Sequence, residues 1–178
     1  MTKTNKNLVF PINELLEKPI GTTIDFAFET DVEFEDFQTK SNLTGDLEIM
    51  RIDDGFNAKV SDVSITVSLP CERCLGSFTH QIDELTSECQ FYFDAPEGES
   101  DAFDIHLVDK KHLKIDISEL IRQEIILHFP TNQVCSQGCR GICSACGANK
   151  NEKPCNCKVE IHEPEANKPL AALKDLIK

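Results

Sequence analysis

Apolar and polar residues alternate in several stretches of this chain between residues 23 and 93. A period of two is typical of half-buried antiparallel strands, because successive side chains point to opposite faces of a sheet. The clearest stretch is 63–69, and the same alternation is found at 23–28, 43–49 and 78–93. Asp53-Asp54-Gly55 predicts a hairpin turn between two of these stretches, since glycine readily takes the positive φ of such turns. The pattern predicts an antiparallel sheet.

A helical pattern follows at about residues 117–128, where apolar residues recur every three or four positions. Asp116, with Glu119 three residues later, has the spacing of a capping box at the start of this helix. Phe129-Pro130 ends it, because the residue before a proline disfavours helical geometry. We expect the apolar face of this helix to pack on the sheet.

Shorter elements are expected on either side of the sheet and helix. They are a single helical turn at 11–16, a short strand pair within 105–115 and a short helix over 169–178. Together these elements predict an α+β fold: a mainly antiparallel, bent or barrel-like sheet with one packed helix.

Charge divides the chain into two unlike parts. Residues 1–130 carry 11 Lys and Arg against 26 Asp and Glu, a net charge of −15, whereas residues 131–178 carry 7 against 5, a net charge of +2. We therefore expect an acidic β-rich domain over 1–130 and a separate module over 131–178. An acidic body repels nucleic-acid phosphates and favours basic proteins as direct partners, with Glu33, Glu35 and Asp36 as candidate contacts. Acidity that serves only solubility is the alternative interpretation.

Cysteine is the most informative residue type of the chain. Six of the nine cysteines lie within residues 135–157, and Cys71-Glu72-Arg73-Cys74 adds a pair at the hairpin tip expected after Pro70. Closely spaced thiolates on tight turns are how a chain surrounds a tetrahedral Zn²⁺. Eight thiols are the number needed for two four-cysteine zinc sites. The predicted metal ligands are Cys71, Cys74, Cys135, Cys139, Cys143, Cys146, Cys155 and Cys157.

Two ways of dividing these thiols are open. The compact loop C-x2-C-Gly-x7-C-x-C over residues 143–157 predicts one local site. By elimination, Cys135 and Cys139 would then join Cys71 and Cys74, so that zinc staples the C-terminal module to the sheet. Alternatively, one site is drawn from the six tail cysteines alone, while Cys71 and Cys74 are merely reduced.

Disulfide bonds are the alternative use of these cysteines. They persist in oxidising compartments, and residues 1–11 lack the apolar region of a signal peptide. No apolar run reaches the roughly 18 residues of a membrane span. We therefore expect a cytoplasmic protein with reduced, metal-binding thiols. The ninth cysteine, Cys89, alternates in phase with Phe91 and is expected to be a small buried hydrophobe, and His80 is expected in the core or at its rim rather than as a ligand.

Three separated motifs of this chain resemble those of a known protein family. They are Pro70-Cys-Glu-Arg-Cys-Leu-Gly-Ser-Phe before a Phe/Tyr-rich strand, Ile115-Asp-Ile-Ser-Glu-Leu-Ile-Arg-Gln-Glu-Ile-Ile-Leu, and a cysteine array with Cys-Gly-Ala-Asn that ends in Cys-Asn-Cys. In this order they resemble the YceD family, the large-ribosomal-subunit RNA accumulation proteins of bacteria and plastids. The resemblance runs from about Leu69 to the C-terminus. It implies a non-enzymatic factor that supports accumulation or maturation of the large-subunit (23S) ribosomal RNA.

Other function classes are disfavoured by the sequence. Phosphate-binding loops, dinucleotide-binding glycine motifs and H-E-x-x-H are missing, and all-thiolate sites are structural rather than catalytic. The expected partner is a precursor of the large ribosomal subunit, contacted through a basic ribosomal protein, with indirect or weak RNA binding and no membrane or small-molecule substrate. The alternative function is a zinc-thiol redox sensor or chaperone. A DNA-binding zinc ribbon is disfavoured by the acidic body.

Overall fold

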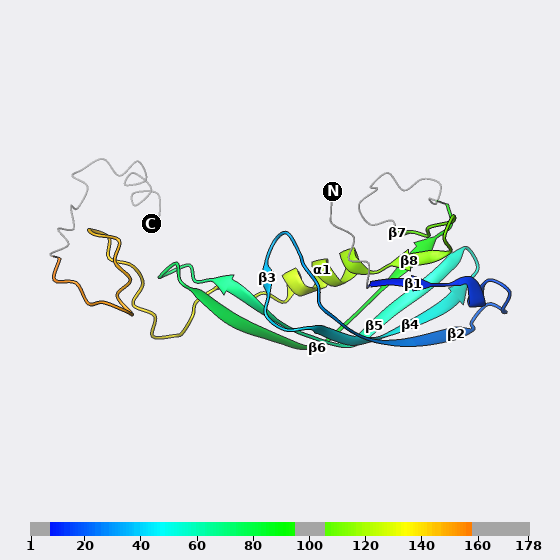
Figure 1. The fold of residues 1–178 in the computed structure, drawn as a ribbon, viewed down its shortest axis with the longest axis horizontal. Coiled ribbons are helices and arrows are strands. Elements are labelled where there is room, and N and C mark those ends of the chain that lie inside the picture. The colour runs from blue at the N-terminus through cyan, green and yellow to red at the C-terminus, as the bar shows by residue number, and fades with distance from the viewer. Residues whose placement is uncertain (1–7, 95–105, 158–178) are drawn as a thin grey trace, which may run out of the picture.

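The computed structural model describes residues 8–94 and 106–157 (Figure 1). The helix expected over 169–178 lies outside these residues. In chain order the elements are β1 (Val9–Pro11), the 3-10 helix η2 (Asn13–Leu15), β2 (Thr23–Thr30), β3 (Gln38–Thr39), β4 (Leu43–Ile52), β5 (Gly55–Pro70), β6 (Ser77–Tyr92), β7 (His106–Leu107), β8 (Lys114–Asp116) and α1 (Ser118–Leu127).

The strands form one main sheet and one small ribbon. In the main sheet the order is β2-β4-β5-β6-β7, and β3 pairs with the far part of β5. All pairings are antiparallel except β6 with β7, and β1 pairs antiparallel with β8. The expected antiparallel sheet is confirmed. In the described part of the chain the sheet is open, with β2 and β7 at its ends, so no closed barrel forms.

One face of the sheet is buried under α1 and β1. The alternating apolar residues of the strands point to this face, where Ile49, Phe56 and Phe91 are almost fully buried. Helix α1 contributes Ile121 and Ile125, which are completely buried, and it packs on β6 (Figure 1). The helix was predicted within one residue at either end. None of the helices in the described residues is long and apolar enough to cross a membrane.

The start of α1 differs from the predicted capping box. Asp116 Oδ1 accepts a hydrogen bond from the backbone N–H of Ser118 at 2.9 Å, as expected of a residue near a helix start. Glu119 does not return to Asp116, because both of its carboxylate oxygens accept hydrogen bonds from Arg122, at 2.9 and 2.6 Å. Arg122 also pairs with Asp36 at 2.6 Å. The carboxylate therefore joins a cluster that ties residue 36 to the helix.

The strand pair expected within 105–115 is found in a different arrangement. β7 pairs with β6 and β8 pairs with β1, so the two strands separate into different sheets. Only the isolated bridge between Asp109 and Lys114 joins the two sides of the turn. Alternation in sequence indicates that a strand is half-buried, but it does not identify the strand's partner.

The long hairpin of β5 and β6 carries the chain's first cysteine pair away from the core. Both strands have 16 residues, and Figure 1 shows the hairpin curving well beyond β2 and β4. The register shifts twice around Val63, where Asp62 and Glu84 take positive φ values of 52° and 57°. Such bulges bend a strand pair and increase its twist. Cys71 and Cys74 therefore project from the end of the sheet.

Gly55 is required at the expected hairpin turn for a reason other than its φ. β4 and β5 are joined through Asp53 and Asp54, and Ile52 pairs with Gly55. Gly55 is not among the glycines with positive φ. Instead, a Cβ at this position would lie 1.9 Å from the carbonyl oxygen of Phe91 on the neighbouring strand. The hairpin is confirmed, and glycine is needed here for close approach of β6.

Candidate metal centres

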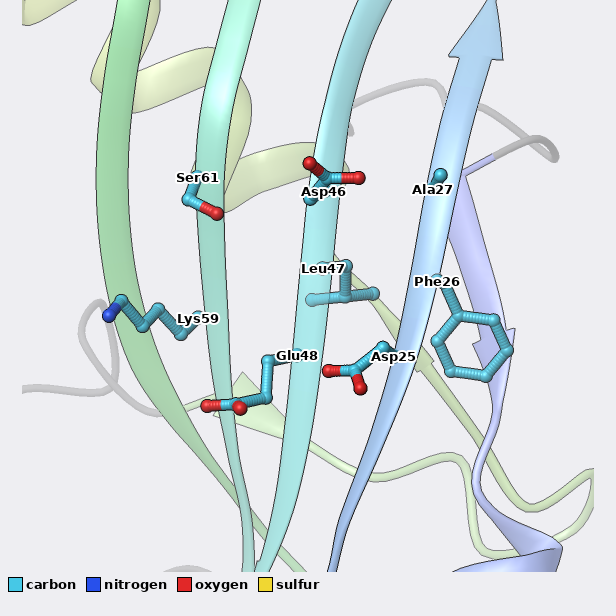
Figure 2. A pocket seen from close by; sticks show the side chains of 8 residues that line it. All are labelled: Asp25, Phe26, Ala27, Asp46, Leu47, Glu48, Lys59 and Ser61. Carbon is cyan, nitrogen blue, oxygen red and sulfur yellow. The ribbon is translucent and has the colours of Figure 1, made fainter.

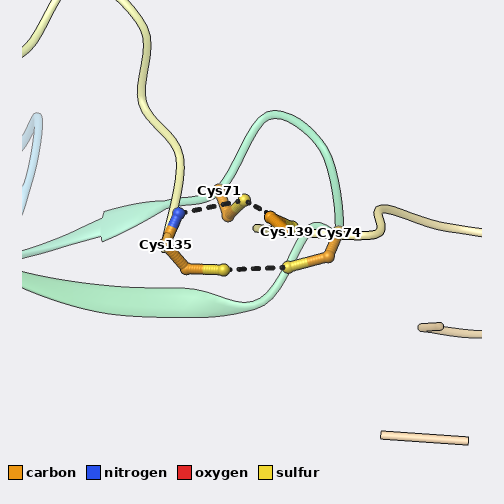
Figure 3. A group of neighbouring side chains, drawn as sticks. All are labelled: Cys71, Cys74, Cys135 and Cys139. Carbon is orange, nitrogen blue, oxygen red and sulfur yellow. Dashed lines mark hydrogen bonds between the residues drawn. The ribbon is translucent and has the colours of Figure 1, made fainter. Parts of the chain in front are cut away.

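Four cysteines from two distant segments meet at the tip of the long hairpin. Cys71 and Cys74 lie between β5 and β6, while Cys135 and Cys139 follow α1 in sequence, and Figure 3 shows all four side chains converging. Their sulfur atoms lie within 4.8 Å of one another, and the Cys71–Cys139 and Cys74–Cys135 pairs are each 3.8 Å apart. We call this group the hairpin site.

Backbone hydrogen bonds shape the hairpin site. The N–H of Cys71 donates to the carbonyl of Gly76 and the N–H of Leu75 donates to the carbonyl of Cys71, both at 2.8 Å, which closes a tight turn around the pair. Leu75 takes a φ of 61° in this turn. The N–H of Glu72 donates to the carbonyl of Gln133 at 2.8 Å, which brings the second segment alongside. The sulfurs are consequently aimed at one point by backbone geometry.

The other four cysteines form a second group within one short loop. They are Cys143, Cys146, Cys155 and Cys157, whose sulfurs also lie within 4.8 Å of one another. We call this group the tail site. Gly147, at φ 71°, allows the turn in which its N–H donates to the carbonyl of Cys143 at 2.8 Å. Cys143 is buried, whereas Cys146 and Cys157 are exposed, so this site is the more open to solvent.

The two loops that carry these groups contact each other directly. The N–H of Ile142 donates to the carbonyl of Arg73 at 2.9 Å. Gly141 takes a φ of 68°, and a Cβ there would lie 2.9 Å from the same carbonyl oxygen. Only glycine combines this backbone conformation with such a close approach. Neither Arg73 nor Gly141 was identified from the sequence, because their contact joins segments about 70 residues apart.

The thiols of each group differ in their readiness to ionise. Burial acts to raise the pKa of Cys71, but hydrogen bonds from backbone N–H groups outweigh it and lower the pKa to about 6. Backbone N–H groups of Cys146 and Ala145 likewise lower the pKa of Cys143 to about 6. Conversely, hydrogen bonding with Cys139 raises the pKa of Cys135 to about 12. A cation that binds all four sulfurs of a group displaces the protons of the thiols with the higher pKa values.

The geometry of both groups suits a tetrahedral ion. Sulfurs about 2.3 Å from a central Zn²⁺ lie about 3.8 Å apart along the edges of a tetrahedron, and the two measured pairs of the hairpin site lie 3.8 Å apart. The described residues place no His, Asp or Glu in either group. The two groups of four can therefore hold metal ions, and they are the same two sets that the local-loop interpretation of the sequence predicted.

Cys89 and His80 lie apart from both groups. Cys89 is half-buried on β6 opposite Ala58 and packs against the core. Burial, with a smaller effect of the Glu88 charge, raises the pKa of its thiol to about 12. His80 is half-buried and paired with Val67 in the hairpin. Neither residue belongs to a group of three or more potential metal ligands in the described part of the chain.

Comparison with known proteins identifies relatives of this architecture. The family described as "Large ribosomal RNA subunit accumulation protein YceD" matches residues 61–177, more than half of the chain. The chain belongs to the YceD family. The matched region includes the projecting part of the β5–β6 hairpin, α1 and all eight grouped cysteines. Residues 8–60, which build β1 to β4, lie outside the YceD match.

Two plant relatives bear the YceD name. The "Large ribosomal RNA subunit accumulation protein YCED homolog 1, chloroplastic" of Arabidopsis thaliana is 35% identical over 72 residues, 38% of this chain and 22% of that protein. The protein of the same name from Zea mays is 37% identical over 81 residues, 42% of this chain and 26% of that protein. The chain thus matches about a quarter of each relative's length. No solved structure matches it.

Proposed function

We propose that this YceD protein is a non-enzymatic ribosome biogenesis factor that supports accumulation or maturation of large-subunit (23S) ribosomal RNA. The family match supports the ribosomal role. The two groups of four converging sulfurs carry the rest of the proposal, because a closed thiolate shell leaves a metal no position for substrate or water. The metal then stabilises structure instead of taking part in a reaction.

In this proposal two zinc ions are bound, one at the hairpin site and one at the tail site. Zn²⁺ fits the all-sulfur donor set and the tetrahedral spacing. The hairpin-site ion staples the acidic domain, residues 1–130, to the cysteine-rich module, residues 131–178. Each four-thiolate site adds a formal charge of about −2, so the module loses the weakly basic character that its sequence suggests.

The partner that we propose is a basic ribosomal protein on the large-subunit precursor, met in the cytoplasm. The uncovered face of the main sheet supports this choice. Figure 2 shows Asp25 of β2 and Asp46 and Glu48 of β4 projecting beside Lys59 of β5, around a shallow pocket. Asp25 and Glu48 stand directly opposite each other in register. Like charges in facing positions destabilise a sheet. Lys59 faces Glu48 from β5 and offsets part of that cost, and cations of a partner would offset more of it.

The acidic residues first considered as contacts are less suited to a test of this proposal. Asp36 is paired with Arg122 at 2.6 Å, so reversing its charge would disturb the packing of α1. Asp25 and Glu48 form no ion pair within residues 8–94 and 106–157. Glu48 also faces Lys59 in register, so the two carboxylates can be neutralised with less effect on the fold than a reversal of their charges. RNA contact in this proposal is indirect or weak, because the residues that the structure describes carry no stripe of cations that could follow a nucleic-acid backbone.

Sucrose-gradient sedimentation of the tagged protein, with sequencing of co-migrating RNA, tests the proposed function. We expect the protein in fractions that hold large-subunit precursors, and its absence from them would contradict the ribosomal role. The double variant Asp25→Asn, Glu48→Gln should leave those fractions if the sheet face is the contact, because it removes both charges without placing lysines opposite Lys59. Glu17→Gln, at an exposed position outside the sheet, is the matched control and should stay bound.

A second candidate function is a zinc-thiol redox sensor or chaperone. The exposure of Cys146 and Cys157 favours it, because oxidants reach metal-bound thiolates that are open to solvent. Metal retention in mild peroxide separates the two functions. A structural pair of sites keeps both ions, whereas a sensor releases the ion of the tail site and regains it on reduction.

A further inference from the structure

The side chain of Asn151 connects the two cysteine groups. Its Nδ2 donates a hydrogen bond to Sγ of Cys139 at 3.3 Å, and its Oδ1 accepts one from the backbone N–H of Arg140 at 2.8 Å. Cys139 belongs to the hairpin site, whereas Asn151 lies in the loop between Cys146 and Cys155 of the tail site. A residue from the loop of one candidate site therefore contacts a sulfur of the other.

The chemistry of its neighbours fixes the orientation of the Asn151 amide. A backbone N–H can only donate, so the side-chain atom that faces Arg140 is the oxygen. The NH₂ group consequently faces Cys139, whose sulfur is an acceptor. A turned amide would lose both hydrogen bonds, because two donors would meet at one end and two acceptors at the other.

The loop that carries Asn151 is itself held in place. The backbone N–H of Asn151 donates to Oδ1 of Asn149 at 3.0 Å, and the N–H of Lys150 donates to the carbonyl of Gly141 at 2.9 Å. The N–H of Lys153 donates to the carbonyl of Asn149 at 3.0 Å. A metal bound by tail-site cysteines on both sides would close this loop and reduce its freedom. Closure of the tail site thus favours the position from which Asn151 reaches Cys139.

We propose that Asn151 is a positioning residue that couples the two sites, so that metal at the tail site tightens metal binding at the hairpin site. This inference rests on the proposed function, in which both sites hold an ion. Four thiolates around a dication carry a formal charge of −2, and an N–H donor aimed at one sulfur stabilises that charge. Coupling is reciprocal, so metal at the hairpin site tightens the tail site by the same factor.

The size of the effect follows from other hydrogen bonds to metal ligands. Loss of such a partner lowers metal affinity by about 10-fold to 100-fold. For Asn151→Ala we expect the affinity of the hairpin site to fall by about tenfold. Asn151→Asp keeps an oxygen for the Arg140 N–H but places a carboxylate beside the Cys139 sulfur, so its loss of affinity should be larger.

The test is a double-mutant cycle on the full-length chain loaded with ¹¹³Cd²⁺, whose NMR resonances report each site separately during titration with a chelator. The variant Cys155→Ser, Cys157→Ser empties the tail site. In the native background this change should weaken the hairpin site about tenfold. In the Asn151→Ala background the same double substitution should lower the Cd²⁺ affinity of the hairpin site little further, because the coupling residue is already missing. Equal losses in the two backgrounds would overturn the proposal.

Asn156→Ala is the matched control for this cycle. Asn156 is an exposed asparagine between Cys155 and Cys157 and has no side-chain hydrogen bond within the described residues. The control should leave both affinities and both resonances unchanged. Asn151→Ala should shift the hairpin-site resonance, since it removes a hydrogen bond to a ligand sulfur. An unshifted resonance would count against direct contact between Asn151 and Cys139.

The same spectra separate this inference from the proposed function. If two resonances are seen and the losses of hairpin-site affinity caused by the two changes simply add, the coupling alone is overturned and the two-site function stays in place. A single resonance at saturating cadmium overturns both. Circular dichroism checks that each variant keeps the sheet, and Asn151→Asp supplies a second cycle if Asn151→Ala does not fold.

Discussion

The Sγ atoms of Cys74 and Cys135 lie 3.8 Å apart, although 61 positions separate the two residues in sequence. Three features bring them together. The β5–β6 hairpin carries Cys74 to the far end of the sheet, α1 packs back along β6, and the chain after α1 then continues to the hairpin tip (Figure 1). The hairpin site is therefore a product of the whole fold, whereas the tail site is local.

Zinc content is the first prediction. The purified protein should contain two zinc ions per chain, and Cys71→Ser should reduce this number to one, because the hairpin site loses a ligand while the tail site keeps all four. Elemental analysis by mass spectrometry measures the ratio. Cys89→Ser is the matched control and should retain two. A Cys71→Ser protein that also retains two would contradict the pairing.

The second prediction concerns Gly141. Gly141→Ala should lower the free energy of unfolding by about 1 to 3 kcal/mol, because alanine disfavours a positive φ and its Cβ would press on the Arg73 carbonyl. Zinc should also leave the hairpin site faster. Denaturant titration and chelator-driven zinc release measure the two effects. Gly138→Ala, where an added Cβ would meet nothing within 4 Å, should behave like the unsubstituted protein.

Thiol reactivity gives a third prediction. Burial raises the pKa of Cys89 to about 12, so at pH 8 only about one thiol in ten thousand is in the reactive thiolate form. After zinc is removed by a chelator, iodoacetamide should label the exposed Cys146 quickly and Cys89 only once the sheet unfolds. Mass spectrometry of the labelled peptides follows both residues. Comparable labelling of the two in the folded protein would refute the burial of Cys89.

The fourth prediction concerns acid stability. Hydrogen bonds from Arg122 hold the pKa of Glu119 below its ordinary value of 4.5. The unfolded chain therefore binds this proton first as pH falls, and stability from the pair is present above pH 4.5 and lost as pH falls through the lowered value. Arg122→Met should remove this acid-dependent loss of stability, and it should lower the free energy of unfolding by roughly 1 kcal/mol near neutral pH.

Chemical denaturation at a series of pH values from 6 to 3 measures this effect. The slope of unfolding free energy against pH should be shallower in Arg122→Met than in the unsubstituted protein. Lys110→Met is the control, because the Lys110–Asp94 pair is largely exposed and should contribute little. Equal slopes in all three proteins would show that Glu119 has no part in the acid response.

Local patterns in the sequence were sufficient to predict β2, β4, β5, β6 and α1, and they gave the observed grouping of the thiols as one of two divisions. Alternation identified β5 because Val63, Ile65 and Val67 all point to the core. The spacing of the tail site was informative because all four cysteines lie in one short loop. The hairpin site could be inferred only by elimination, since the Cys71 and Cys74 pair has no second pair of thiols nearby in the sequence.

Features that depend on contact between distant segments could not be predicted from the sequence. The pairing of β7 with β6 and of β8 with β1 depends on how the chain returns to the sheet. Gly141 and Asn151 have ordinary sequence neighbours, and their roles depend on Arg73 and Cys139 in another loop. The open sheet also follows from strand pairing, which alternation does not specify.

The separation of Cys74 from Cys135 also sets an order of events during synthesis. At about 5 to 20 residues per second, a ribosome that has added Cys74 needs roughly 3 to 12 s to add the next 61 residues, the last of which is Cys135. Throughout this interval the nascent chain holds only two of the eight grouped thiols, Cys71 and Cys74 of the hairpin tip. The tail-site cysteines follow Cys139 closely, so the last ligands of both sites are added within one short stretch of synthesis, between residues 139 and 157.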